Sequence, residues 1–138
     1  MIELNYKIEG GNFSKAGYAS SQVKKKLKQF NIASKLIKNI VVALYEAEVN
    51  IVAHAANGEI EVQITPGKVL VYARDEGPGI PDVEKAMQEG YSTASEEVRQ
   101  MGFGAGMGLP NIKKNVDVLE IDTDVGKGTT LKMIKNIV

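Results

Sequence analysis

Three polar side chains recur at four-residue intervals in one stretch of the chain: Glu46, Asn50 and His54. In an α-helix, residues four apart lie on nearly the same face, so these three would form one polar stripe. A carboxylate can hold or deprotonate a nucleophile, and an amide oxygen can bind Mg²⁺ together with phosphate oxygens. The stripe suits a metal–phosphate site, although, taken alone, a solvated helix face is the simpler interpretation.

A carboxylate and two glycines, Asp75, Gly77 and Gly79, follow the apolar run 69–73. A carboxylate at the end of a strand can accept a hydrogen bond from an exocyclic amine such as that of adenine. Glycines let the backbone approach a flat ligand closely. Alone, the Gly-Pro-Gly sequence is more typical of a tight turn, so its interpretation depends on the other motifs.

Glycine occupies every second position from Gly102 to Gly108, directly before an expected helix at 109–117. Backbone amide groups exposed at the start of a helix bind anions. The segment lacks the Gly-Lys-Ser/Thr of a P-loop and the spacing and βαβ context of a Rossmann fingerprint. Because packing hardly explains four alternating glycines, the pattern predicts phosphate binding. Two hydroxyls, Thr129 and Thr130, open the last expected strand and could bind a ligand directly or through water.

Hydrophobic periodicity predicts the elements that must position these residues. Strands are expected at 2–8, 59–65, 68–74, 118–123 and 128–135, and helices at 14–30, 34–56 and 109–117. The long helix carries Ile37, Ile40, Leu44, Ala47 and Ile51 on a face distinct from the polar stripe. Because patterned sequence flanks the glycine-rich stretch 75–108 on both sides, that stretch is expected to be a functional loop region inside one domain, 1–138.

Composition excludes several classes of site. The 138 residues include no cysteine and one histidine, which excludes disulfides, thiolate metal sites, a cysteine nucleophile and multi-histidine metal sites. Lys plus Arg and Asp plus Glu both number 17, so the zero net charge argues against nucleic acid or a membrane surface as partner. The basic run 24–28 is interpreted as a solvated helix face. No signal peptide or membrane-length apolar run is found, and a cytoplasmic location is expected.

In this order, the four features resemble the GHKL (Bergerat-fold) ATPase and kinase superfamily, which includes histidine kinases, gyrase B and MutL. Within it, the chain is most similar to the standalone anti-sigma-factor serine kinases and the stressosome switch kinase, over nearly its whole length. The resemblance implies an α+β fold, a two-layer α/β sandwich whose mixed, mostly antiparallel sheet is covered on one face by helices.

The resemblance also implies a role for each motif. Glu46 would be the general base that activates a protein serine hydroxyl, Asn50 would bind the Mg²⁺ that bridges the phosphates, and Asp75 would bind the adenine amino group. The other residues implied to line the ATP site are His54, Gly77, Gly79, Gly104, Gly106, Met107, Gly108 and Thr130, with Thr129 as the alternative to Thr130. Residues 81–103 correspond to the ATP lid, in which Arg99 is the arginine nearest the place of a family phosphate contact.

Two functions are compatible with these features. The first is an ATP- and Mg²⁺-dependent serine/threonine protein kinase that transfers the γ-phosphate to a STAS-type antagonist protein. The partner would be such an antagonist or a sigma factor, and the family also allows a homodimer. The alternative is a nucleotide-gated protein-binding module with little or no phosphotransfer, in which ATP orders a lid and creates a partner surface. Glu46 distinguishes the two, because a purely binding site does not require a general base.

Overall fold

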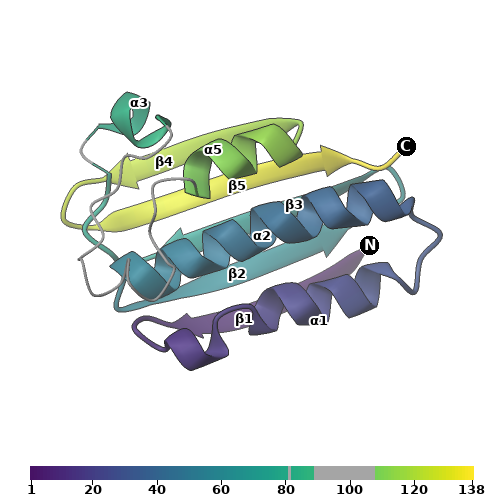
Figure 1. The fold of residues 1–138 in the computed structure, drawn as a ribbon, viewed down its shortest axis with the longest axis horizontal. Coiled ribbons are helices and arrows are strands. Elements are labelled where there is room, and N and C mark those ends of the chain that lie inside the picture. Colours follow the sequence, from purple (N-terminus) through teal and green to yellow (C-terminus); the bar gives the residue numbers. More distant parts are fainter. Residues whose placement is uncertain (81, 89–107) are drawn as a thin grey trace.

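In the computed structural model, residues 1–80, 82–88 and 108–138 are described, and within them a five-stranded sheet carries helices on one face (Figure 1). The elements, in chain order, are β1 (Ile2–Glu9), the 3-10 turn η1 (Phe13–Lys15), α1 (Tyr18–Leu27), α2 (Ser34–His54), β2 (Asn57–Ile64), β3 (Lys68–Asp75), α3 (Val83–Ala86), α5 (Gly108–Asn115), β4 (Val118–Asp124) and β5 (Gly128–Asn136). No described helix is both long and apolar enough to cross a membrane. The predicted two-layer α+β architecture is confirmed.

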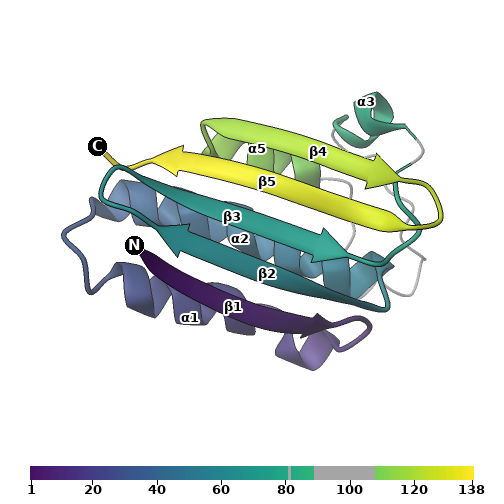
Figure 2. The same ribbon diagram turned by 180° about the vertical axis from the view of Figure 1, so that it is seen from behind.

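The strand order is β1-β2-β3-β5-β4, and all four pairings are antiparallel, so the described sheet is antiparallel throughout rather than mixed. Residues directly opposite each other in an antiparallel pair point to the same face. Ile60, Ala73 and Leu131 form one such row, and all three are buried beneath the helices. The other face carries no helix in the described part of the chain (Figure 2).

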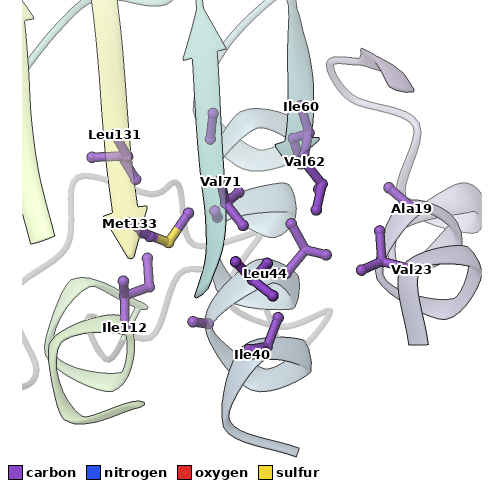
Figure 3. Close-up of a cluster of buried hydrophobic side chains, with 14 of the residues drawn as sticks. Ala19, Val23, Ile40, Leu44, Ile60, Val62, Val71, Ile112, Leu131 and Met133 are labelled. Atoms are coloured by element: carbon purple, nitrogen blue, oxygen red, sulfur yellow. The ribbon is translucent and has the colours of Figure 1, made fainter. Parts of the chain in front are cut away.

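Helix α2 lies along the middle of the sheet, with α1 on the β1 side and α5 on the β4 side (Figure 1). Its predicted apolar face is confirmed, because Ile37, Ile40, Leu44, Ala47 and Ile51 are all buried. Figure 3 shows how the layers join: Leu44 and Ile40 point toward Val71 and Met133 of the sheet, Val23 of α1 lies at one side and Ile112 of α5 at the other. Burial of these side chains fixes α2 between two helices and the sheet.

The helix expected at 14–30 is divided in the structure, because Gly17 adopts a φ of +96°, in the left-handed region that favours glycine. Helix α1 therefore begins at Tyr18. Its first amide groups are directed at a carboxylate of α2: Gly17 N and Ala19 N donate to Glu48 Oε2 at 3.0 and 3.1 Å. Ser20 donates to Glu48 Oε1 through its N (3.1 Å) and its Oγ (2.6 Å). The cap of α1 thus comes from a residue far away in sequence.

Positive charge collects on α1 and the start of α2. Residues 10–45 hold seven lysines and no Asp or Glu, so the rest of the chain carries an equal excess of acid. The exposed members, which we call the lysine surface, are Lys15, Lys24, Lys25, Lys28, Lys35 and Lys38. Because the end of α1 is joined directly to the start of α2 by residues 28–33, most of these lysines lie on neighbouring helix ends (Figure 1).

Candidate functional site

The carboxyl-terminal end of α2 is held tightly against the loop that follows β1. Gly10 N donates to Ala56 O at 2.9 Å, and Gly11 N donates to Val52 O at 2.8 Å. A Cβ at Gly10 would overlap the carbonyl oxygen of Ala55, so only glycine allows this approach. The last turns of α2, which carry the predicted polar stripe, are therefore fixed at the end of the sheet where β1 ends and β2 begins.

Two of the stripe residues meet the last glycine of the glycine-rich segment. A Cβ at Gly108 would lie 3.4 Å from Glu46 Oε2 and 3.5 Å from Asn50 Oδ1. Gly108 is the first residue of α5, so the start of this helix lies directly beside the carboxylate and the amide. The structure thus brings Gly108 beside Glu46 and Asn50, which precede it by more than fifty positions in the sequence.

The Glu46 carboxylate is half-buried and lies beside the start of α5. Burial raises its pKa from the ordinary value, and a side-chain hydrogen bond from Asn111 lowers the pKa in part. A carboxylate that is partly removed from water is a stronger base than an exposed one, because its charged form is less well solvated. Glu46 therefore has the environment that a general base requires.

Asp75, at the end of β3, lies beside the last residue of α2. Its Oδ1 accepts a hydrogen bond of 2.8 Å from Gly77 N, and within residues 1–80, 82–88 and 108–138 no hydrogen bond to Oδ2 is found. A Cβ at Gly77 would lie 3.1 Å from Ala55 Cβ. The loop of residues 76–80 after β3, which we call the glycine loop, therefore packs against the end of α2. Burial lowers the pKa of His54, and the charge of Asp75 opposes that shift. Burial thus favours the neutral form of the His54 ring, whereas the nearby Asp75 carboxylate favours the charged form.

The glycine loop is also fixed to the turn between β4 and β5. Gly126 N donates to Pro78 O at 2.8 Å, and a Cβ at Gly79 would lie 2.6 Å from Asp124 O. Ile80 N donates to Thr123 Oγ1 at 2.8 Å. The loop after β3 is thus held from both sides, by α2 and by this turn.

The register of β5 places the two candidate hydroxyls, Thr129 and Thr130, on different faces of the sheet. Thr129 lies opposite Asp75, is buried, and shares a 2.9 Å hydroxyl–hydroxyl hydrogen bond with Thr123. Thr130 lies opposite Arg74 and Asp122, on the face of the sheet without helices. Because successive strand residues point to opposite faces, Thr129 replaces Thr130 as the hydroxyl on the Asp75 side.

Four other predicted ATP contacts, Arg99, Gly104, Gly106 and Met107, lie outside the described residues, as does the predicted lid apart from 82–88. Two residues of the site were missed, Thr123 and Asn111. Thr123 shares the inward parity of Leu119 and Ile121 in its strand, which is a usable signal. Asn111 is one turn from Gly108, but its importance depends on how α5 meets α2.

The side chains of the site can be compared with the ligands that a metal ion requires. Among the described residues, no group of three or more His, Asp or Glu side chains could hold a metal ion by itself. The amide oxygen of Asn50 is a neutral oxygen ligand of the kind that Mg²⁺ accepts, and Mg²⁺ usually completes its shell with phosphate oxygens and waters. The residues present fit a magnesium ion that arrives with a nucleotide.

Comparisons with known proteins identify a family model and several relatives. Residues 16–135 match the family model described as histidine kinase-like ATPase domain. The anti-sigma F factor of Thermoanaerobacter sp. (strain X514) is 34% identical over 142 residues, covering 99% of this chain and 94% of that protein. The serine/threonine-protein kinase RsbT of Bacillus subtilis (strain 168) is 33% identical over 100 residues, covering 70% of this chain and 69% of that protein.

Two solved structures share the fold. The RsbU and RsbW domains of a Mycobacterium tuberculosis protein align with a TM-score of 0.66 and 17% identity, over 98% of this chain and 32% of that one. The mycobacterial sensor histidine kinase MprB aligns with a TM-score of 0.57 and 18% identity, over 98% of this chain and 97% of that one. At these identities the likeness is one of fold.

Proposed function

The chain belongs to the histidine kinase-like ATPase domain family, and we propose that it is an ATP-dependent serine/threonine protein kinase of the anti-sigma-factor or switch-kinase type. One observation carries the proposal: the Glu46 carboxylate and the Asn50 amide both lie beside Gly108 at the start of α5. A base, a magnesium ligand and the end of an anion-binding loop would then share one small space.

The other described residues of the site would hold the nucleotide. Asp75 keeps one carboxylate oxygen available for the adenine amino group, and Gly77 lets the backbone lie close to the base. Thr129 would face the same side, directly or through water. Asn50 would hold Mg²⁺, and the neutral His54 would add no positive charge beside it. The bound Mg-ATP would supply the γ-phosphoryl group.

Glu46 would take the proton from the substrate hydroxyl. As a serine oxygen attacked the γ-phosphorus, the bond from that phosphorus to the β–γ bridging oxygen would break and ADP would leave. The serine proton would move to the Glu46 carboxylate, which burial has made more basic than an exposed glutamate. General-base catalysis of this kind contributes roughly 10²- to 10⁴-fold to a rate. The Glu46 carboxylate is thus the group that separates a kinase from a site that only binds.

For the partner, we propose a STAS-type antagonist protein as the phosphate acceptor and a sigma factor as a second, non-covalent partner. Support comes from relatives that are named anti-sigma F factor and serine/threonine-protein kinase. We propose accordingly that the protein acts in the cytoplasm and takes part in the regulation of transcription.

The test is phosphotransfer with purified components. With Mg-ATP and a STAS-type antagonist, phosphoserine or phosphothreonine is expected on the antagonist. Glu46→Gln should lower the transfer rate by roughly 10²-fold or more while ATP still binds, because only the base is lost. Glu120→Gln, an exposed residue of β4, is the matched control and should transfer normally. Normal transfer by Glu46→Gln would remove Glu46 from the mechanism. Tight ATP binding without transfer to any antagonist would indicate the nucleotide-gated binding module instead.

A further inference from the structure

Asn111 lies on the face of α5 that meets the proposed base. Gly108 and Asn111 are three residues apart, so they lie on one face of the helix, one turn from each other. Gly108 has no side chain, and a Cβ there would already lie 3.4 Å from Glu46 Oε2. The first turn of α5 thus approaches Glu46 closely. Asn111 follows one turn later on the same face, where its side-chain amide lowers the pKa of the same carboxylate in part.

The backbone that carries Asn111 is fixed on both sides. Leu109 and Ile112 are buried in the core, the latter completely. Asn115 Nδ2 donates to Asn111 O at 2.8 Å, which ties the next turn to this one. An amide on such a segment is held in place before any ligand arrives, so a hydrogen bond from it to Glu46 would cost little further ordering.

We propose that Asn111 is the positioning residue for Glu46: its side-chain amide holds the carboxylate toward Asn50 and the start of α5, where a substrate hydroxyl would be deprotonated. The inference rests on the proposed role of Glu46 as the base. An amide suits this task because it donates a hydrogen bond without bringing a positive charge, whereas a lysine or arginine would stabilise the carboxylate strongly and weaken it as a base. One amide also leaves most of the acceptor sites of the carboxylate unoccupied for the incoming proton.

The kinetic test compares three variants with the wild type. Asn111→Ala removes the hydrogen bond, and Asn111→Asp keeps the shape but replaces the donor with a second carboxylate. We expect kcat for phosphotransfer to fall about tenfold in the first, a part of what a general base contributes, and further in the second. The affinity for ATP should stay within about twofold for Asn111→Ala, since the base does not hold the nucleotide. Lys113→Ala, an exposed residue of the same helix, is the control and should match the wild type.

A second measurement does not depend on kinase activity. In protein labelled with ¹³C at glutamate Cδ, the Glu46 resonance is identified as the one that disappears in Glu46→Gln. At fixed pH, Asn111→Ala should shift this resonance and leave the other glutamate signals in place. An unmoved Glu46 resonance, or an Asn111→Ala variant with wild-type kcat, would overturn the positioning role. If the wild type transfers no phosphate to any antagonist, the proposed kinase function fails, and the resonance alone then decides whether Asn111 orients Glu46.

Discussion

Two glutamates of α2, only two residues apart, have opposite surroundings. Two residues correspond to about 200° around a helix, so Glu46 and Glu48 point to opposite sides. Glu48 faces α1, is 1% exposed, and accepts four hydrogen bonds from Gly17, Ala19 and Ser20. Glu46 faces the start of α5 and is partly exposed, and the Asn111 side chain lowers its pKa in part.

The difference teaches that burial alone does not make a carboxylate reactive. The charge of Glu48 is offset by amide groups at the start of a helix, which favour a negative charge both as hydrogen-bond donors and through the helix dipole. Its oxygens are fully occupied, so it serves structure. Glu46 has lost part of its solvent without gaining as many donors, which leaves it basic and able to accept a proton. The number of donors, more than the depth of burial, separates the two roles.

The largest expected effect is the loss of stability when Glu48, the structural glutamate, is replaced. Glu48→Ala leaves three amide groups and a hydroxyl at the start of α1 without their acceptor, in a buried place. We expect the free energy of unfolding to fall by about 3 kcal/mol or more, because each unsatisfied buried donor costs roughly 1–3 kcal/mol and water can satisfy some of them. Urea unfolding measures it, with Glu120→Ala as an exposed control. A loss below about 1 kcal/mol would mean that apolar packing alone holds α1.

Gly108→Ala tests the surroundings of Glu46, the other glutamate of this comparison. A Cβ at this position would meet Glu46 Oε2 and Asn50 Oδ1 at ordinary contact distances, so the fold should tolerate it, within about 0.5 kcal/mol. The methyl group would nevertheless occupy the space between the base and the magnesium ligand. We expect ATP affinity or phosphotransfer to fall about tenfold, equivalent to about 1.4 kcal/mol, measured by calorimetry and by transfer assay. Unchanged binding and transfer would show that this space is not used.

Glu46→Gln tests the difference between the two glutamates through the pH dependence of protein stability. Burial raises the pKa of Glu46 in the folded protein, so the folded state binds a proton more readily than the unfolded state. The resulting stabilisation is complete below the ordinary glutamate pKa and is lost as pH rises through the folded value. At pH 7 the neutral glutamine should therefore be more stable than the wild type in the absence of nucleotide, with the advantage shrinking as pH falls toward 4.5. Thermal unfolding across this range measures the trend; a variant less stable at pH 7 would contradict it.

The smallest expected effect concerns His54. Its pKa is lowered in the folded protein, so below the ordinary value of 6.5 the unfolded state binds a proton that the folded state refuses. Stability should be independent of this residue above about pH 7 and should decline as pH falls through 6.5. His54→Asn should lose this part of the pH dependence, measured by urea unfolding at several pH values. An identical slope in both proteins would place His54 outside the buried site.

The sequence predicted the parts of this arrangement that depend on local period. The apolar and polar faces of α2 follow from helical spacing, and the hairpin of β2 and β3 follows from alternation around Pro66-Gly67. The long-range contacts could not be predicted in the same way. The break at Gly17 depends on Glu48, 31 positions later, and the choice of Thr129 over Thr130 depends on strand register. The contact of Asn111 with Glu46 appears only once α5 packs on α2.

The lysine surface means that a net charge of zero does not make this molecule electrically symmetric. One end carries an excess of positive charge and the remainder an equal excess of negative charge, so the protein has a permanent electric dipole moment. At low ionic strength it should therefore adhere to a sulfonate cation-exchange matrix by that end, at a pH where its formal charge is zero. Near 0.15 M salt the field is screened over about 8 Å, and retention should vanish.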